Sequence, residues 1–269
     1  MGIVGIVKQT IKDYSLIEGS EKIAVALSGG KDSTSALYIL KELGYNVCGL
    51  MIDLHLGEWS RIHRKNMKNF CRNIGVPFEV IDLKEELGQG ICFIKAVLKK
   101  RKNLTGCAVC GVVKKWLLNR GAKRIGAKKL ATGHNLDDEV QNVLMNFLKG
   151  NIFLGKNSGP IVGACEIEGF VRRIKPLFFV HEEDILAYAR KMNFEILYDK
   201  CPCAYGTYRV ETREWAELLS REQKQKIVRN FLRFSMKERV RKIEVSCCKS
   251  CGEPSKNELC NACKIFAEI

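Results

Sequence analysis

The fold of this chain is decided by the stretch Ile23-Ala-Val-Ala-Leu-Ser-Gly-Gly-Lys-Asp-Ser33. Its first five residues form a continuous apolar run, which predicts a short strand buried on both faces, as in a parallel sheet. From Ser33 to Leu43 apolar residues recur at helical spacing, and Gly44 suits the end of that helix. A turn between such a strand and a helix directs free backbone N–H groups and the positive end of the helix dipole to one place, which favours an anion.

The turn itself supplies the groups of a phosphate site. Glycines let the backbone approach phosphate oxygens closely, Lys31 adds a positive charge, and Asp32 and Ser33 are suited to orient a metal ion or a phosphate oxygen. The spacing differs from the Walker A pattern G-x-x-x-x-G-K-[ST]. An ordinary glycine-containing turn is the alternative, but the position between strand and helix favours phosphate binding by Ser28, Gly29, Gly30, Lys31, Asp32 and Ser33.

Strand and helix patterns alternate from Lys22 to about Lys200, which predicts an α/β fold with a Rossmann-like parallel sheet and helices on both faces. Further strands are predicted at 46–53, 77–82, 129–132 and 170–174, and further helices at 61–74, 136–148 and 182–192. Residues 212–240 are predicted to be helical and strongly basic. We divide the chain into an N-terminal segment 1–21, a nucleotide-binding catalytic domain 22–205, a basic helical segment 206–243 and a C-terminal module 244–269.

Composition narrows the class of protein. The chain has 269 residues, 46% of them hydrophobic, so it can bury a large core and the bulk of it is not disordered. A net charge of +15 favours a polyanionic partner such as nucleic acid, although a solvated surface can carry the same excess. No apolar run approaches the ~18 residues of a membrane span and no signal peptide is evident, so we expect a cytoplasmic protein without a membrane partner. Because cytoplasmic thiols stay reduced, the 13 cysteines favour metal or redox chemistry over disulfides.

Two later segments carry the residue types of a reactive site. Cys107-x-x-Cys110 suits a zinc half-site, a redox dithiol or part of an iron–sulfur site, and Lys114 follows one helical turn later. The second segment, Ala-Thr-Gly-His-Asn-Leu-Asp-Asp-Glu at 131–139, lies between a predicted strand and a helix. Its acids, Asp137 and Asp138, either cap the helix or hold magnesium or the nucleotide. Gly133 and His134 are the segment's other candidates for nucleotide binding. An isolated histidine such as His134 is, however, more often a hydrogen-bonded residue than a catalyst.

Together these motifs resemble the PP-loop ATP pyrophosphatase superfamily, and within it the tRNA 2-thiolation enzymes that act on uridine. A third cysteine of that pattern, followed by proline, matches Cys201-Pro202. The resemblance implies that loop 28–33 holds the pyrophosphate part of ATP. At the end of the second strand, Asp53 or Met51 would meet the adenosine; a plain strand-end cap is the equal alternative for Asp53.

The resemblance also implies the chemistry. ATP with Mg2+ adenylates the O2 oxygen of a tRNA uridine, and sulfur then displaces AMP to give 2-thiouridine. Cys107, Cys110 and Cys201 would hold a [4Fe-4S] cluster, leaving one iron without a protein ligand to carry sulfide; a persulfide on one of these cysteines is the competing chemistry. Lys114 would stabilise developing charge, and either Asp137 or Asp138 would bind metal or accept a proton. A spare thiol, Cys203, follows Cys201.

The tail has the spacing of a structural zinc site. Two C-x-x-C knuckles suit a tetrahedral Zn2+, formed by Cys248, Cys251, Cys260 and Cys263. Cys247 is the alternative to Cys248 by a shift of register. Beside the basic stretch 221–242, this module is expected to help grip the tRNA backbone. The four remaining cysteines have no partner spacing and are expected to be small buried residues: Cys48, Cys71, Cys92 and Cys165.

The sequence departs from the family in one respect, because its relatives of the uridine type usually begin with a second cysteine module and here no cysteine precedes Cys48. We favour wobble uridine 34 over T-loop uridine 54 as the target. Free sulfide or a ubiquitin-like thiocarboxylate carrier would supply sulfur, and relatives are commonly homodimers. The competing interpretations are a metal-containing RNA-binding module without catalysis, and a PP-loop ligase acting on another carbonyl substrate; the ligase has no use for three cysteines.

Overall fold

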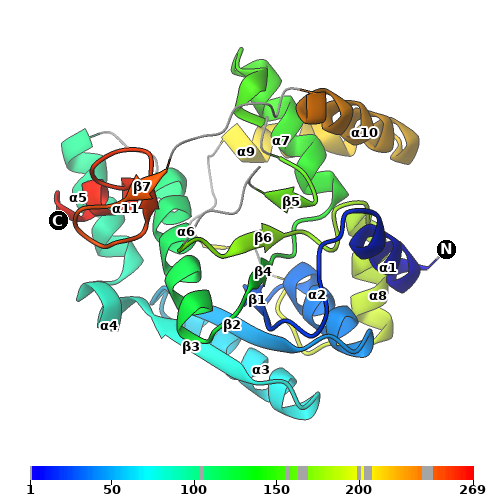
Figure 1. The fold of residues 1–269 in the computed structure, drawn as a ribbon, viewed down its shortest axis with the longest axis horizontal. Coiled ribbons are helices and arrows are strands. Elements are labelled where there is room, and N and C mark those ends of the chain that lie inside the picture. The colour runs from blue at the N-terminus through cyan, green and yellow to red at the C-terminus, as the bar shows by residue number, and fades with distance from the viewer. Residues whose placement is uncertain are drawn as a thin grey trace.

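One mixed sheet organises the chain (Figure 1). The computed structural model describes residues 2–102, 106–155, 158–162, 169–198, 201–202, 208–237 and 245–269. The sheet order is β3-β2-β1-β4-β6-β5, in which β5 alone runs antiparallel to its neighbour. The strand bounds are β1 Ile23–Leu27, β2 Val47–Asp53, β3 Phe78–Asp82, β4 Lys129–Ala131, β5 Ile161–Val162 and β6 Arg172–Ile174. The predicted parallel sheet is thus confirmed.

Helices cover both faces of the sheet because apolar residues of the strands point alternately to each side. Ile23, Val25 and Leu27 of β1 join one buried core, and Ala24 joins the other. The first core is completed by α1 Ile3–Asp13, α2 Lys31–Glu42, α3 Glu58–Asn73 and α8 Glu182–Lys191. The second is completed by α4 Leu83–Leu87, α5 Ile91–Lys102, α6 Gly106–Arg124 and α11 Asn261–Phe266. The helix α1, which sequence patterns left unassigned, buries Val7 in the first core.

A third, smaller core lies beside the sheet, at the top of Figure 1. It joins α7 Leu136–Leu148 to α9 Tyr208–Glu217 and α10 Arg221–Lys237, with η1 Ile152–Gly155 packed on α7. The segment predicted to be helical at 212–240 is therefore two helices over its described part. The break has a local cause: the Ser220 hydroxyl accepts the N–H of Gln223 at 3.2 Å, while the Gln223 side chain accepts the N–H of Ser220 at 2.8 Å. This reciprocal capping starts a new helix.

The tail docks on α6 rather than standing apart. Its hairpin strands β7 Ser246–Cys247 and β8 Pro254–Ser255 precede α11, whose Phe266 ring packs edge-on against Trp116 of α6 at 5.0 Å. Glu253 binds the same helix, with an oxygen 2.9 Å from Lys123 Nζ. None of the described helices is both long and apolar enough to span a membrane.

Candidate functional site

The phosphate loop, residues 28–33, connects the carboxyl end of β1 to the start of α2, as predicted. Lys31 is the first residue of α2, and Gly30 precedes it with extended backbone. The Ser33 hydroxyl is buried under the loop, where it accepts the N–H of Ser28 at 3.1 Å and lies 3.2 Å from the Gly30 carbonyl oxygen. Ser33 thus shapes the loop from beneath, and the N-terminal N–H groups of α2 lie at the crevice of the sheet.

Two glycines allow neighbouring segments to pack closely against the phosphate loop. Gly29 has a φ of +84°, and a Cβ there would lie 1.9 Å from the Nδ1 atom of His63 on α3. Gly133, in the turn between β4 and α7, rests on the loop itself. A Cβ at Gly133 would lie 2.7 Å from the backbone nitrogen of Ser33 and 2.8 Å from the carbonyl carbon of Asp32. The predicted 131–139 segment is therefore in van der Waals contact with the phosphate loop.

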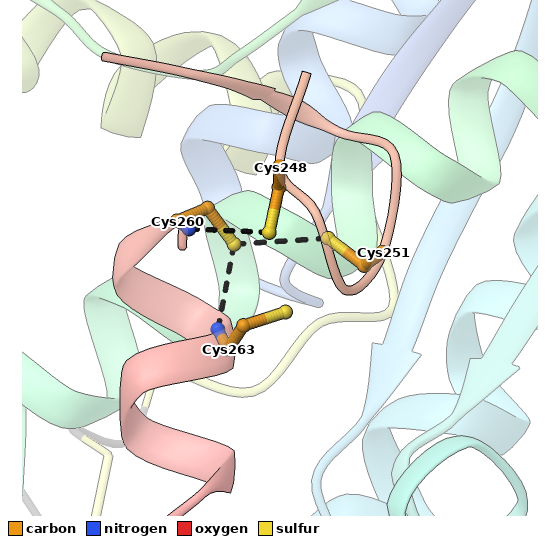
Figure 2. Close-up of side chains that lie close together, drawn as sticks. All are labelled: Cys248, Cys251, Cys260 and Cys263. Carbon is orange, nitrogen blue, oxygen red and sulfur yellow. Dashed lines mark hydrogen bonds between the residues drawn. The ribbon is translucent and has the colours of Figure 1, made fainter. Parts of the chain in front are cut away.

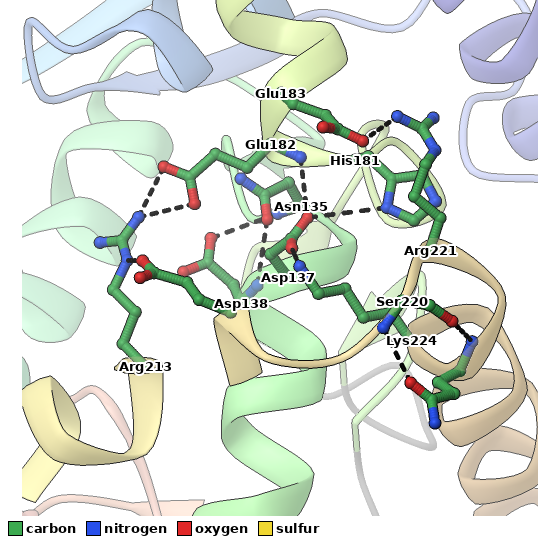
Figure 3. A network of polar contacts seen from close by, with 12 residues as sticks. Asn135, Asp137, Asp138, His181, Glu182, Glu183, Arg213, Ser220, Arg221 and Lys224 are labelled. Atoms are coloured by element: carbon green, nitrogen blue, oxygen red, sulfur yellow. Dashed lines mark hydrogen bonds and ion pairs between the residues drawn. The ribbon is translucent and has the colours of Figure 1, made fainter. Parts of the chain in front are cut away.

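Charged groups of the loop are bound by residues far along the chain (Figure 3 shows the surrounding network). Lys31 Nζ contacts Asp32 Oδ2 at 3.0 Å and Glu182 Oε1 at 2.7 Å. Burial disfavours the charged amine, but the two carboxylates outweigh it and raise the pKa of Lys31. Glu182 also binds Arg213 of α9, whose Nη2 atom lies 2.5 and 2.6 Å from its oxygens. Asn135 donates to Asp32 Oδ1 at 2.9 Å, although burial still raises the pKa of Asp32.

The two predicted acids at the start of α7 have different surroundings. Asp138 forms a capping box with Asn135: each side chain accepts the backbone N–H of the other, at 3.0 and 3.3 Å. Asp137 faces α8 and α10, accepting the Glu182 N–H and the Lys224 ammonium, both at 2.7 Å. Burial raises the pKa of Asp137, but these bonds outweigh it and set the pKa below its ordinary value. Asp137 therefore joins three helices, whereas Asp138 lies closer to the loop through Asn135.

Two single residues had competing interpretations. His134 is half-buried, and its Nδ1 atom lies 2.9 Å from the Thr132 hydroxyl, as a hydrogen-bonded residue would be. Asp53 is buried at the end of β2 and accepts the backbone N–H of His55 at 2.9 Å, as a strand-end cap would. The Met51 side chain lies in the first core.

The three cysteines of the reactive motif come from two distant segments. Cys107 and Cys110 lie in the first two turns of α6, and Lys114 follows Cys110 by one turn. Burial raises the pKa of Cys110, Lys114 lowers it, and the Cys201 and Cys107 thiols raise it. Cys201 is therefore close enough to act electrostatically on Cys110. The spare Cys203 lies outside the described residues.

Four cysteines of the tail form a tight group (Figure 2). The sulfur atoms of Cys248, Cys251, Cys260 and Cys263 all lie within 4.8 Å of one another, and the Cys251–Cys260 pair is 3.7 Å apart. Tetrahedral zinc with bonds of about 2.3 Å would separate sulfurs by about 3.8 Å, so this group fits the ion. Burial opposes ionisation of Cys248, but backbone N–H groups including that of Cys260 outweigh it and lower its pKa to about 6.

The remaining cysteines divide by position. Cys247 is exposed and stays outside the tail group, so the register with Cys248 is the one adopted. Cys48 and Cys71 are buried as predicted, and burial raises the pKa of Cys71 to about 12. The prediction for Cys92 is wrong, because it lies on the exposed side of α5, opposite the buried face formed by Ile91, Ile94 and Leu98. Cys165 lies outside the described residues.

Sequence patterns missed three groups of polar residues, one of which is Glu182 with Arg213, described above. Glu139 and Lys175 form a buried ion pair of 2.6 Å between the α7 motif and the end of β6. His55, Asp53 and Asp82 gather at the ends of β2 and β3, with His55 Nε2 2.6 Å from Asp82 Oδ1 and their possible metal-binding atoms within 4.8 Å. Sequence offered one signal for the second group, two strands that both end in aspartate. For the ion pair, and for Glu182 with Arg213, it offered none.

Comparison with known proteins identifies a matching family and several similar proteins. A family described as a PP-loop domain matches residues 5–204. The tRNA-5-methyluridine(54) 2-sulfurtransferase of Pyrococcus horikoshii is 34% identical, over 97% of this chain and 83% of that protein. Cytoplasmic tRNA 2-thiolation protein 1 of Caenorhabditis elegans is 32% identical, over 97% and 71%. Among solved structures, the U34-tRNA thiolase NcsA from Methanococcus maripaludis with its [4Fe-4S] cluster has a TM-score of 0.81 and 27% identity, over 98% and 87%.

Proposed function

Because this chain belongs to the PP-loop family of tRNA 2-thiolation enzymes, we propose that it is a sulfurtransferase that uses ATP to replace the O2 oxygen of a tRNA uridine with sulfur. The observation that carries the proposal is the sheet topology, which directs both the phosphate loop and the cysteine motif toward the carboxyl ends of the parallel strands. β4 is parallel to β1 and follows α6, so the first two turns of α6, with Cys107 and Cys110, lie toward the edge where β1 ends.

The phosphate loop would hold the β- and γ-phosphates of ATP on the N-terminal N–H groups of α2 and on Lys31. The uridine O2 would then attack the α-phosphate, releasing pyrophosphate. Asp32 and Asp138 would hold Mg2+; this is supported by the position of Asp32 in the loop and by the hydrogen bonds of Asn135 to both residues. Asp137 is already bound by Lys224 and by the start of α8, which supports a positioning role.

The cysteine motif would serve the sulfur-transfer half of the reaction. Cys107, Cys110 and Cys201 would hold a [4Fe-4S] cluster, which supplies an iron without a protein ligand where sulfide can bind. Lys114, one turn after Cys110, would stabilise the negative charge that develops as AMP leaves.

The tail and the basic helix α10 would contribute to tRNA binding. The tail cysteines would hold Zn2+ as a closed structural site, with no open position for catalysis. The ion would fix the hairpin and α11 against α6, the helix that carries the cysteine motif. Positive side chains of α10 would meet the tRNA backbone without reading its sequence.

Within this function we favour wobble uridine 34 as the target, which the fold shared with NcsA supports. The 34% identity to an enzyme named for uridine 54 supports the second candidate, the T-loop position. Free sulfide or a thiocarboxylate carrier would donate sulfur, and a homodimer in the cytoplasm is our expectation. Nuclease mapping of modified tRNA distinguishes the two positions.

Anaerobic reconstitution with iron and sulfide, followed by incubation with tRNA, ATP and sulfide, tests the proposal. Nucleoside mass spectrometry should detect 2-thiouridine, together with AMP and pyrophosphate. Cys107→Ala and Cys201→Ala should lose the product and keep ATP binding, whereas Cys92→Ala, an exposed cysteine outside both groups, should behave as wild type. Tight tRNA binding without AMP release or product would instead indicate a binding module.

A further inference from the structure

The Glu182 carboxylate bridges two cations that belong to different parts of the chain. Its Oε1 atom lies 2.7 Å from Lys31 Nζ of the phosphate loop and 2.5 Å from Arg213 Nη2 of α9. Its Oε2 atom is 2.6 Å from the same guanidinium nitrogen. Burial raises the pKa of Glu182, but Lys31 and Arg213 outweigh it and lower the pKa, so the bridging group is an anion.

A doubly coordinated carboxylate occupies the kind of place that a phosphate group takes. Ammonium and guanidinium groups bind phosphate oxygens as well as carboxylate oxygens, and arginine can bind either one with two N–H groups. Because one Glu182 oxygen reaches both Lys31 and Arg213, a single phosphate can also reach both. The neighbouring N–H groups of α2 would add to the attraction for phosphate.

From this arrangement we propose that Arg213 is a phosphate-binding residue for ATP and that Glu182 is the anion it exchanges for the nucleotide. The inference rests on the proposed ATP-dependent function. When ATP binds, its β- and γ-phosphates bridge Lys31 and Arg213, and the Glu182 carboxylate leaves that position. No covalent bond changes in this step, which is an exchange of one anion for another.

Through Arg213, the proposed nucleotide site would also contact α9, the helix that follows Cys201 in the chain. α9 begins at Tyr208, six residues after Pro202, and its Ala216 is buried with Leu136 at the start of α7. The guanidinium therefore extends from a helix that is anchored on the α7 motif. Bound triphosphate would hold α9 to α2, and release of pyrophosphate would return Arg213 to Glu182.

A purely structural ion pair makes the opposite prediction for one variant. If Arg213 only fastens α9 to α8, Glu182→Gln weakens that fastening and leaves ATP affinity equal or lower. If Glu182 competes with phosphate, the same substitution removes the competitor and raises ATP affinity several-fold. The sign of the change in Glu182→Gln thus separates the two roles.

The experiment is isothermal titration of the full chain with ATP, AMP and inorganic pyrophosphate in the presence of Mg2+, without tRNA or sulfide. Arg213→Ala should lower affinity for ATP and pyrophosphate by about 10-fold or more, because a charge-assisted hydrogen bond to the phosphates is lost. Affinity for AMP, which has no β- or γ-phosphate, should be unchanged. Arg213→Lys should recover part of the loss. The matched control is Arg124→Ala on α6, which breaks an ion pair with Glu86 of α4 and should bind ATP as wild type.

Circular dichroism melts of each variant separate loss of binding from loss of folding. Wild-type ATP affinity in a folded Arg213→Ala, or unchanged or lowered affinity in Glu182→Gln, would overturn the inference without counting against the proposed tRNA thiolation. ATP binding that follows the expected pattern in a protein that makes no 2-thiouridine would support the inference and count against the proposed function. Absence of ATP binding by the wild type would overturn both.

Discussion

Replacing Gly133 with alanine tests whether the contact between the β4–α7 turn and the phosphate loop shapes the site. The added Cβ would lie 2.7 Å from the Ser33 nitrogen, 2.8 Å from the Asp32 carbonyl carbon and 2.9 Å from the Ser33 Cα atom. Non-bonded heavy atoms prefer separations of about 3.5–4.0 Å, so the two segments must move apart by more than about half an ångström. All three neighbours are backbone atoms, so no side-chain rotation can relieve the contact.

The magnitude follows from this overlap. Overpacking of a well-packed region costs about 1–3 kcal/mol, and each kcal/mol lowers the melting temperature by roughly 2–4 °C in a chain of this size class. We therefore expect Gly133→Ala to melt about 2–12 °C below wild type. Displacement of the phosphate loop should also lower kcat/KM for ATP by about 10- to 100-fold, because catalytic positioning is sensitive on the ångström scale.

Thermal melts and ATP-dependent formation of 2-thiouridine measure both effects. Gly90→Ala is the control, since its Cβ would meet its nearest neighbour, the His55 Cβ, at an ordinary 3.5 Å. That variant should lose less than about 1 kcal/mol of stability and keep its ATP dependence. A Gly133→Ala protein with wild-type melting and wild-type ATP kinetics would refute the idea that this contact is tight.

Three further predictions concern other parts of the structure. Lys175→Met should destabilise the protein by about 3–5 kcal/mol in urea unfolding, because it leaves the Glu139 carboxylate buried without its partner. Recovery of stability on adding the second change Glu139→Gln would support this cause. A loss of stability below about 1 kcal/mol in Lys175→Met would contradict it. The lowered pKa of Asp137 should stabilise the fold above the ordinary aspartate value of about 3.9, and this contribution should be lost as pH falls below it. Asp137→Asn should therefore differ most from wild type at pH 6, and the difference should shrink as pH falls through the lowered pKa of Asp137; a difference that is constant with pH would exclude the Lys224 contact as the source. Cys260→Ser should release zinc measurable by atomic absorption and lower the melting temperature, and an unchanged zinc content would contradict the tail site.

Local patterns in the sequence were sufficient for the strand, the phosphate loop and α2, because each depends on residues within a few positions of one another. The apolar run at 23–27 indicates burial on both faces, and the glycines and Lys31 follow directly after it. The four tail cysteines were equally accessible, since two C-x-x-C pairs close together constrain a tetrahedral site by spacing alone. Family motifs extended this reach to a prediction for Cys201, which no local spacing links to Cys107 and Cys110.

Helix boundaries and exposure were less accessible. Cys92 had no distinguishing spacing, yet its place on α5 depends on which face of that helix meets the sheet. The break between α9 and α10 depends on the reciprocal hydrogen bonds of Ser220 and Gln223. These capping residues lie inside a basic, amphipathic stretch whose pattern predicts one continuous helix.

The sequence by itself therefore determined the fold class, the phosphate loop and the group of four tail cysteines, since these follow from periodicity, turn chemistry and ligand spacing. Only the tertiary structure decided which charges face one another across the crevice. Lys31 and Glu182 are 151 positions apart, and Arg213 lies on a third element. Their meeting depends on how α8 and α9 dock beside α2, and docking is set by the buried cores rather than by any pattern near the charged residues.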